Sequence, residues 1–470
     1  MIPARHAVAG AALLIATLSF ASHVHGRAPT AATVSVRIDP HGSAIASSAL
    51  GLSIEWDSVE AYTGPPGHRR AALARLLAGV ARQAHSPLAL RIGGDSGDQV
   101  WWNPTGRRRP ATVLQDVTPR TLGAVAWLAR ALRAPVTLGL NLALGDPANA
   151  LALALAARRQ LPPGSLEALE IGNEPDLYTL AHTFRVPGHV HRRLRKYARY
   201  GAERWIHDSA RYLSVLRRGL GDGPRLSVAG FAGGGWWPAL DRALPGPLRL
   251  AGAISGHLYA LPSCSAPTPS MAWLLSPAAS RGRVASLTSL AAIAGRQRLP
   301  LRVTELNSAA CGGRAGLSER FGSALWLTDT LFALQRVGAQ QTDVHTWLHA
   351  RYAPFVPRGA GVDARPEFFG MLAFARAAPR GSRLAVTAVD QPRGLRTWAT
   401  VDDRGVTRVA LIARAAVSAN VRTGHDAACA DLWLVSAGHG PSRRRVCPPY
   451  RVRLAARSLA VLTVPAAGPR

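Results

Sequence analysis

Two glutamates each come after a short apolar run of the chain. Glu174 follows Leu166–Ile171 in the string Ile-Gly-Asn-Glu-Pro, and Glu305 follows Leu301–Val303 in the string Val-Thr-Glu-Leu-Asn. A carboxylate at the end of a buried strand is costly unless it is paired or put to use. Two such carboxylates on one scaffold are the groups that cleavage of a glycosidic bond needs, one as acid and one as nucleophile or base. The alternative, two exposed loop glutamates, does not account for such specific flanking strings.

Two kinds of segment alternate between residues 49 and 378. Runs of strand length alternate with stretches whose apolar residues recur every three or four positions, as they do in helices. The strand-like runs are Ala49–Ile54, Leu88–Ile92, Val136–Leu140, Leu166–Ile171, Leu226–Ala229, Ala251–Leu258, Leu301–Val303 and Thr342–Trp347. The helical stretches are clearest at Arg69–Ala84, Arg120–Leu132, Tyr197–Arg218, Ala285–Ala294 and Ser318–Val337. This pattern predicts an α/β fold, a (β/α)8 barrel over 49–378.

An open, doubly wound sheet is the alternative α/β architecture. It would need a Gly-rich phosphate loop after the first strand, and Gly51-Leu-Ser-Ile-Glu-Trp is not such a loop. In a barrel, the residues at the carboxyl ends of the strands face one mouth. Glu174 would follow the fourth strand and Glu305 the seventh, so we expect both carboxylates in that mouth.

The pattern changes after Pro379, where short strand candidates are separated by Gly, Asp, Pro and Arg. The candidates are Leu384–Val389, Leu395–Val401, Val406–Ile412, Leu432–Val435, Val452–Leu454 and Leu459–Val464. They predict a C-terminal antiparallel β-sandwich over 379–470. Residues 27–48 contain the alternating run Thr33–Ile38, which we expect to add a strand to that sandwich. Because no low-complexity linker is evident, we expect the sandwich to pack against the barrel.

Residues 1–26 have the organisation of a secretory signal peptide. Arg5 and His6 precede the apolar stretch Ala7–Ala21, and small residues follow as far as Gly26. The apolar stretch of about 15 residues is short for a membrane span, although an uncleaved anchor is the alternative. We therefore expect a secreted protein with no stable membrane insertion after removal of the signal.

Four cysteines fit an exported protein with disulfides. Cys429 and Cys447 are close in the sequence, and we expect them to pair. Cys264 and Cys311 each come a few residues after a predicted strand, which favours a second bridge, although three pairings are possible in principle. The sequence has no Cys-x-x-Cys motif or Cys/His cluster, so we predict no metal site and no organic cofactor.

The formal charge is +29, from 56 basic and 27 acidic residues. A basic surface could attract an acidic polysaccharide or a nucleic acid. However, Lys196 is the only lysine, and an excess of Arg beside much Ala and Gly also fits a GC-rich genome. Runs such as Arg107–Arg109 and Arg443–Arg445 are more often solvated surface than binding sites. The charge alone therefore predicts no nucleic-acid partner.

Several strings at the predicted strand ends resemble one known family. Asn-Glu-Pro after the fourth strand and Thr-Glu after the seventh resemble the retaining glycosidases of clan A. Further matches are Leu90-Arg-Ile-Gly-Gly-Asp-Ser-Gly-Asp98, Gly139-Leu-Asn-Leu142, His257-Leu-Tyr259 and Glu305-Leu-Asn-Ser-Ala-Ala-Cys-Gly-Gly313. Together they resemble glycoside hydrolase family 79, the heparanase and β-glucuronidase family. The resemblance spans the barrel, and in the C-terminal domain it is one of architecture only.

The resemblance implies a role for each glutamate. Glu174 would be the general acid/base and Glu305 the nucleophile of a double displacement, in which a glycosyl ester forms on Glu305 and water resolves it. The two carboxyl groups would then lie about 5–5.5 Å apart. Asn173 would hydrogen-bond the sugar 2-hydroxyl, unless it only shapes the turn before Pro. Tyr259 would donate to Glu305, unless it is a core aromatic, and His257 is either a neighbour of the site or a core residue.

The resemblance also implies how a uronic acid would be bound. The backbone N–H groups of Gly312 and Gly313 and the Tyr352 hydroxyl would hold its carboxylate. The alternative for the glycines is a simple turn. Glu55 and Asp95 would accept hydrogen bonds from sugar hydroxyls. Residues that could line the pocket or a neighbouring subsite are Trp102, Trp347 and Tyr62, although aromatics are as often packing residues.

The chain also departs from the family. Cys311 stands before the glycine pair where the animal members carry a different residue, and no removable linker segment is evident, so we expect no activation by proteolysis. The leading hypothesis is a secreted retaining β-glucuronidase acting on terminal β-linked glucuronic acid. The alternatives are an exo-glycosidase of clan A for neutral sugars, a non-catalytic carbohydrate-binding barrel, and an Arg-rich protein that binds anionic polymers without specificity. Exo or endo action and the oligomeric state stay open.

Overall fold

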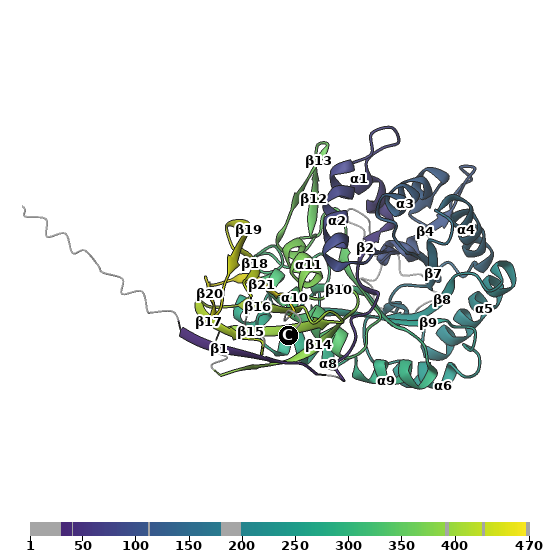
Figure 1. Ribbon diagram of the computed structural model, residues 1–470. Helices are drawn as coiled ribbons and strands as arrows, with labels where there is room; N and C mark the ends of the chain where they lie inside the picture. The colour runs from purple at the N-terminus through teal and green to yellow at the C-terminus, as the bar shows by residue number, and fades with distance from the viewer. Residues whose placement is uncertain are drawn as a thin grey trace, which may run out of the picture.

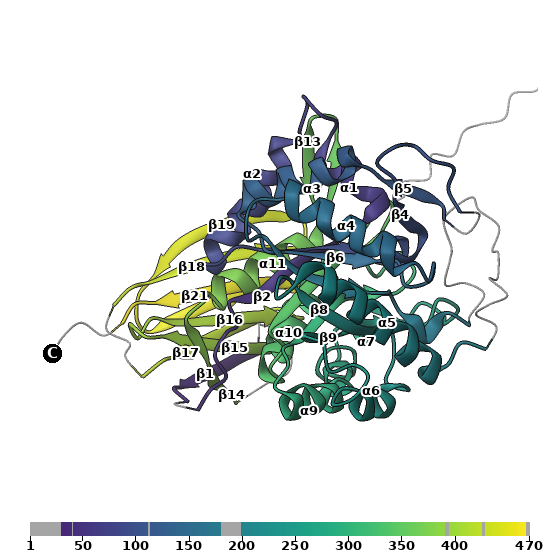
Figure 2. The same ribbon diagram turned by 90° about the vertical axis from the view of Figure 1, so that its right-hand side faces the viewer.

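The computed structural model describes residues 30–39, 41–110, 113–179, 199–390, 394–424 and 428–466. The expected signal segment and the first residues of the helix predicted from Tyr197 lie outside these ranges. Within them, no helix is both long and apolar enough to cross a membrane. In Figures 1 and 2 a barrel surrounded by helices and a second domain built of strands lie side by side.

Eight strands close into a parallel barrel, which confirms the predicted fold class. Their order around the barrel is β10-β11-β2-β3-β6-β7-β8-β9. The strands are β2 (Ser48–Glu55), β3 (Ala89–Gly93), β6 (Val136–Leu140), β7 (Leu166–Ile171), β8 (Arg225–Phe231), β9 (Ala253–Leu261), β10 (Leu301–Ala309) and β11 (Gln341–Thr346). Strands β3, β6, β10 and β11 are buried along their whole length, because helices cover the outer face and side chains fill the inside.

Helices surround the barrel and bury one stripe each. In α2, the buried residues Leu73, Leu77 and Val80 recur at intervals of four and three, the spacing of one helix face. The longer helices are α2 (Ala71–Ala84), α3 (Pro119–Leu132), α4 (Pro147–Gln160), α5 (Ala202–Leu220), α6 (Trp237–Ala243), α9 (Thr288–Gln297), α10 (Gly322–Arg336) and α11 (Pro366–Ala377). Short turns and helices are η1 (Trp56–Ser58), α1 (Val59–Thr63), η2 (Asp95–Gln99), η3 (Pro175–Leu177), α7 (Met271–Leu274), η5 (Ala278–Gly282) and α8 (Arg283–Ala285). Two small ladders pair β4 (Val100–Trp102) with β5 (Gln115–Val117) and β12 (Phe355–Arg358) with β13 (Gly361–Ala364).

Some barrel strands extend further at their carboxyl ends than the sequence predicts. Strands β9 and β10 continue as far as Leu261 and Ala309, so Glu305 lies within a strand and not after it. The apolar run ends at Val303, but polar residues continue the strand because they remain buried in the barrel mouth. The pairing of β10 shifts register between Val303 and Glu305. A bulge of this kind re-aims the side chains that follow it.

The second domain is one continuous sheet of nine strands, in the order β19-β18-β21-β16-β15-β14-β1-β17-β20, and its two halves enclose a hydrophobic core as in a sandwich. Its strands are β1 (Thr30–Arg37), β14 (Ser382–Val389), β15 (Leu395–Asp402), β16 (Thr407–Ala413), β17 (Val417–Arg422), β18 (Ala430–Ser436), β19 (His439–Val446), β20 (Tyr450–Leu454) and β21 (Ser458–Val464). β1 pairs with β14 in antiparallel and with β17 in parallel orientation, so the sheet is mixed and not purely antiparallel. β1 comes from the N-terminal end of the chain and runs parallel to its neighbour β17.

The β domain shares a hydrophobic core with the barrel helices. The Trp398 ring stacks on Phe332 of α10 at 5.3 Å between centroids, and its indole N–H donates to Asp329 at 2.7 Å. Trp433 and Ile412 belong to the same buried cluster as the barrel. The two domains are therefore packed together, as the missing linker predicts.

Candidate active site

Glu174 and Glu305 lie close together in the mouth of the barrel. One carboxylate oxygen of each and a ring nitrogen of His257 are all within 4.8 Å of one another. Retaining glycosidases place their two carboxyl groups about 5–5.5 Å apart, whereas inverting enzymes leave about 6.5–9.5 Å for a water molecule. The geometry therefore fits the double displacement better than a single one.

A sharp turn after β7 places Glu174. Gly172 has a φ of 79°, and Glu174 itself has a φ of 45°, a left-handed conformation that is uncommon for glutamate. The Glu174 N–H donates to the carbonyl of Gly230 at 2.9 Å, which ties the turn to β8. Backbone strain of this kind is typical of functional positions. The Glu174 side chain stays 14% exposed, so it can reach a bound ligand.

Arg91 links the nucleophile candidate to the interior of the barrel. Its guanidinium is fully buried and donates to Glu305 Oε1 at 2.7 Å, to Glu170 Oε2 at 2.7 Å and to Asn173 Oδ1 at 2.9 Å. Burial alone would lower the pKa of Arg91, but Glu170 and Glu305 outweigh it and raise that pKa. Arg91 stood in a quoted motif, yet that motif carries no signal of its role, because its partners lie on β7, on the turn after β7 and on β10.

Glu305 is held as a carboxylate. The Tyr259 hydroxyl donates to its Oε2 at 2.7 Å, and the Nδ1 atoms of His257 and His345 lie 3.7 and 4.0 Å from its oxygens. Burial works to raise the pKa of Glu305, but His345, His257 and Arg91 outweigh it and lower the pKa. Burial and the charge of Glu305 also raise the pKa of Tyr259 well above its usual value, so its hydroxyl remains a donor. This contact is the one predicted for Tyr259.

Glu174 has a different environment. Its Oε1 lies 2.8 Å from Nδ1 of His257, whose side chain is buried. Burial lowers the pKa of His257, but Glu305 and Glu174 outweigh it and raise that pKa. His257 Nδ1 and Glu174 Oε1 can therefore share one proton across their contact. His257 is thus a neighbour of both carboxylates, and not a core residue without a site contact.

Asn173 is fixed by hydrogen bonds on three sides. Its side-chain oxygen accepts from Arg91, its Nδ2 donates to Asp95 at 3.1 Å, and its backbone N–H donates to Asp98 at 2.8 Å. Asp98 also accepts from the hydroxyl of Tyr178 at 2.5 Å. Burial raises the pKa of Asp98 to about 6. Asp98 lies in one of the quoted motifs, but the sequence assigned it no role. In the structure it holds the backbone of Asn173, the residue before Glu174.

Glu55 and Asp95 lie in the same mouth but differ in their contacts. Glu55 is 7% exposed, and it accepts from the N–H groups of Asp95 and Ser96 at 3.0 and 2.9 Å and from the Ser96 hydroxyl. His345 Nε2 lies 3.3 Å from it. A sugar hydroxyl would have to share these occupied oxygens. The Asp95 side chain is exposed at the mouth and accepts from Asn173 Nδ2 at 3.1 Å, so a sugar hydroxyl can reach it.

The loop after β10 carries the glycine pair. Gly312 and Gly313 have φ values of 81° and 90°, and a Cβ added at either would lie 2.9 Å from a side-chain atom of Trp347 or Ser318, respectively. The Gly313 N–H donates to the carbonyl of Ala310 at 3.2 Å, so it is engaged within the turn. In the described part of the chain, nothing accepts from the Gly312 N–H. One of the two predicted donors therefore has no acceptor among the described residues.

Both predicted disulfides are present. Cys264–Cys311 joins the segment after β9 to the loop that carries the glycine pair, and Cys429–Cys447 lies in the β domain. The first bridge confirms the second pairing favoured by the sequence. It also ties the carboxyl ends of two adjacent barrel strands together.

The aromatic residues fall into two groups. Tyr352 is buried beside Tyr259, with 6.5 Å between ring centroids, and burial together with Glu305 raises its pKa well above the usual value. Trp347 is partly exposed next to Gly312. Tyr62 is fully buried, and its hydroxyl lies 2.8 Å from that of Thr346. Tyr62 and the largely buried Trp102 belong to the hydrophobic core of the barrel.

Two sets of three residues bring carboxylate oxygens and ring nitrogens together as a metal site would. They are Glu55, Glu305 and His345, and Glu174, His257 and Glu305. Both sets contain Glu305, and contacts within the sets, such as His257 to Glu174, account for their closeness. They form no site separate from the carboxylate pair.

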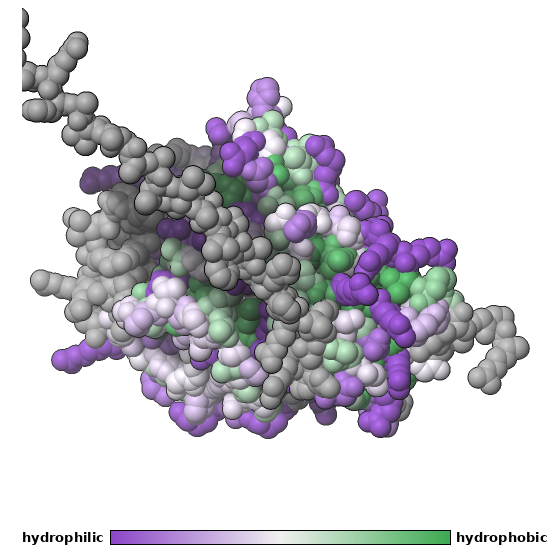
Figure 3. Space-filling model, turned by 90° about the vertical axis from the view of Figure 1, so that its left-hand side faces the viewer, coloured by the Kyte–Doolittle hydropathy of each residue, from purple (hydrophilic) through white to green (hydrophobic). Residues whose placement is uncertain are grey.

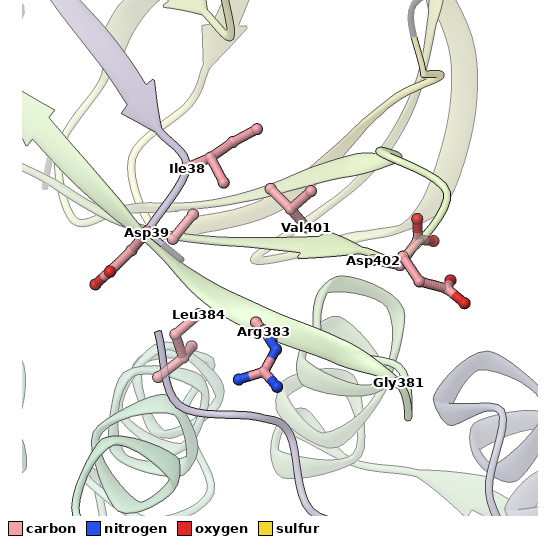
Figure 4. Close-up of a pocket in the computed structure, with 9 residues that line it drawn as sticks. Ile38, Asp39, Gly381, Arg383, Leu384, Val401 and Asp402 are labelled. Carbon is pink, nitrogen blue, oxygen red and sulfur yellow. The ribbon is translucent and has the colours of Figure 1, made fainter. Parts of the chain in front are cut away.

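A hollow of about 180 Å³ lies on the β domain, away from the carboxylate pair. Figure 4 shows Ile38, Arg383, Val401 and Asp402 around it, on the ends of β1, β14 and β15. It is lined by residues that the sequence did not single out. The chemistry described above belongs to the barrel mouth and not to this hollow.

Comparison by structure finds many similar proteins, whereas comparison by sequence finds none. No family model matches it, and no curated protein matches it in sequence. A 4-O-α-L-rhamnosyl-β-D-glucuronidase from Fusarium oxysporum 12S, solved with Rha-GlcA, is similar with a TM-score of 0.74 and 18% identity, over 92% of this chain and 100% of that one. A family 51 arabinofuranosidase from Xanthomonas axonopodis pv. citri has a TM-score of 0.70 and 15% identity, over 92% and 99%. An α-L-arabinofuranosidase from Thermotoga maritima, solved with arabinose, has a TM-score of 0.67 and 14% identity, over 93% and 100%.

These likenesses extend over both domains. At such identities they show the fold alone. The fold is therefore one that glycosidases have, in agreement with the predicted resemblance, and the activity has to be argued from the site.

Proposed function

We propose that this protein is a secreted retaining β-glycosidase. The observation that carries the proposal is the closeness of Glu174 and Glu305, with oxygens within 4.8 Å, in environments that treat them differently. Glu305 is buried and held ionised, while Glu174 is partly exposed and lies against a histidine. Retaining chemistry needs this inequality, since one carboxyl attacks as an anion and the other must deliver a proton.

The reaction follows from these roles. Glu305 attacks the anomeric carbon, and the bond from that carbon to the leaving oxygen breaks as Glu174 gives that oxygen a proton. A water molecule then attacks the same carbon, the ester bond to Glu305 breaks, and Glu174 takes the proton from the water. Arg91 and Tyr259 hold Glu305 in place through both steps, and Asn173 presents its amide to the ligand.

For the sugar, we favour terminal β-linked glucuronic acid. The Gly312 N–H and the hydroxyl of Tyr352, near Glu305, are neutral donors that suit a carboxylate. The structural similarity to a rhamnosyl-glucuronidase supports this choice. Export is supported by the two disulfides, which persist in oxidising compartments.

A neutral sugar is the second candidate. Several similar structures are arabinofuranosidases, and Gly313 uses its N–H within the turn, which leaves one backbone donor instead of two. In this case Gly312 and Gly313 serve only to keep the loop clear of Trp347 and Ser318. The two candidates differ in substrate and share the mechanism.

A panel of nitrophenyl glycosides tests the proposal. We expect the β-glucuronide to be turned over at least about tenfold faster, in kcat/KM, than the β-glucoside, the β-xyloside and the α-arabinofuranoside. The Glu305→Gln and Glu174→Gln variants are the controls, and each should lose most of the activity. If only a neutral glycoside were turned over, the protein would not be a glucuronidase, but the roles proposed for Glu174 and Glu305 would still hold. Full activity in Glu305→Gln would remove the proposed nucleophile.

A further inference from the structure

The two outer faces of the β domain have different environments. Outward residues of β15, β16 and β18, such as Trp398, Ile412 and Trp433, pack into the core that the barrel helices share. The outward residues of β1, β17 and β20 have no such cover. Four of these are exposed arginines, which we call the arginine stripe: Arg37, Arg422, Arg451 and Arg453. In Figure 1 these strands lie at the end of the molecule opposite the barrel.

The strand register makes the stripe continuous. Arg422 is the neighbour of Ser35 on β1, and Asn420, two residues earlier, is the neighbour of Arg451 on β20. Side chains on such diagonal positions of adjacent strands lie about 7–8 Å apart. The intervening residues Val421 and Val452 are buried in the sandwich core, so the arginines all point to the outer face.

Among the described residues, the arginines of the stripe have no ion-pair partner. Strands β1, β17 and β20 contain no acidic residue, and within the described residues no carboxylate pairs with any of the four arginines. Other surface arginines do have such partners, for example Arg120 with Glu60 at 2.7 Å. Asp390 directly follows β14 and lies beside the middle of β1, where it accepts a hydrogen bond from the backbone N–H of Thr33 at 2.6 Å.

Small polar residues fill the space between the arginines. They are Thr33 and Ser35 on β1 and Ser418 and Asn420 on β17. Figure 3 faces this side of the molecule and shows strongly hydrophilic residues at several places on it. The outward positions of the three strands carry no aromatic side chain, and single-stranded nucleic acids need aromatic side chains for stacking. Hydroxyl and amide groups among guanidinium groups instead suit a chain of sugars that bears carboxylates.

We propose that the arginine stripe is an accessory docking surface for an acidic polysaccharide. The proposal rests on the proposed function for the choice of a uronic acid polymer, since the barrel would act on the same kind of chain. Docking on the β domain would raise the local concentration of chain ends near the barrel without any new contact in the active site. It implies that the natural substrate is a polymer and not a small glucuronide.

Binding to immobilised β-1,4-linked polyglucuronic acid tests the proposal. The protein carries Glu305→Gln so that the probe is not consumed. The stripe variant replaces Arg422, Arg451 and Arg453 with Gln. A matched control replaces Arg75, Arg130 and Arg159 with Gln, so that both lose the same charge; these are exposed helix residues with no ion-pair partner in the described part of the chain. We expect the stripe variant to bind at least about tenfold more weakly in about 50 mM salt, and the control to bind within about twofold of the parent.

Three outcomes would overturn the proposal. These are absence of binding by the parent, an equal loss in both triple variants, and tighter binding of single-stranded DNA than of the polyuronate through the same arginines. Thermal unfolding of the variants checks that the sheet remains folded. With Glu305 restored, the stripe variant should keep its kcat/KM on nitrophenyl β-glucuronide. Because binding is measured without turnover, failure of the stripe and failure of the glucuronidase assignment are read separately.

Discussion

At the residue scale, the unequal treatment of the two carboxylates is the main result. The sequence predicted that Glu174 and Glu305 lie together in the barrel mouth, because each follows a short apolar run. The family resemblance of the short strings implied the hydrogen bond from Tyr259 to Glu305. It did not predict the roles of Arg91 and His345, because each is defined by partners far away in the chain, such as Glu305 for Arg91 and Glu55 for His345. Long-range charge contacts of this kind leave no local pattern, and only the closed barrel brings them together.

Replacing Arg91 with Lys tests how Glu305 is held. A lysine ammonium cannot make the forked contacts to Glu305, Glu170 and Asn173 together, so Glu170 is left without its partner in the interior. We expect kcat to fall by about 100-fold. The free energy of unfolding should fall by about 3 kcal/mol. Initial rates and denaturant unfolding measure the two effects.

The control is Arg120→Lys, which changes an exposed ion pair with Glu60. It should cost less than about 1 kcal/mol and leave kcat unchanged. If Arg91→Lys behaved like this control, Arg91 would not hold the nucleophile.

At the element scale, strand ends decide where the chemistry lies. The runs predicted from apolar residues place most barrel strands within a few residues, but they stop before Glu305 and Tyr259, which the extended strands contain. Strands β17 and β19 were missed for a related reason. β17 is short and alternates only small apolar residues with polar ones, which is a weak signal, and β19 is exposed along nearly its whole length and shows no apolar alternation.

Removing the Cys264–Cys311 bridge tests the role of the loop after β10. In the Cys264→Ala/Cys311→Ala variant the free energy of unfolding should fall by about 3 kcal/mol, since the bridge closes a loop of 47 residues. Because the bridge anchors the segment before Gly312, KM for the preferred glycoside should rise several-fold as well. The matched control is Cys429→Ala/Cys447→Ala in the β domain, which should lose stability without a change in KM. An unchanged KM in both variants would show that the bridge does not shape the ligand site.

At the scale of the whole molecule, the sequence predicted a barrel with a β domain packed on it, and the structure confirms that fold class. It did not predict that β1 would lie parallel to β17, because the direction of pairing depends on which strands become neighbours after folding. The barrel also buries several carboxyl groups, and the sequence around them did not predict their burial. These groups make the stability of the whole protein depend on pH.

Asp343 provides the test of this pH dependence. Burial raises its pKa from 3.8 to about 7, so the folded protein binds this proton more tightly than the unfolded chain. The stability that the proton contributes is fully present below about pH 4 and is lost as the pH rises through about 7. We expect Asp343→Asn to flatten the decline of the melting temperature between these values, and the exposed Asp222→Asn to leave it as in the parent. A parallel decline in Asp343→Asn and the parent would contradict the assignment.

The central claim is that Glu305 is the nucleophile of a retaining reaction, with Glu174 as its proton donor. The most direct measurement uses the glycoside that the panel identifies as the preferred substrate and its 2-deoxy-2-fluoro glycosyl fluoride. NMR of the first-formed sugar should show the same anomeric configuration as the substrate. Mass spectrometry of the inhibited protein should locate the added sugar on the peptide that contains Glu305. A first product of inverted configuration, or a label on another residue, would contradict the claim.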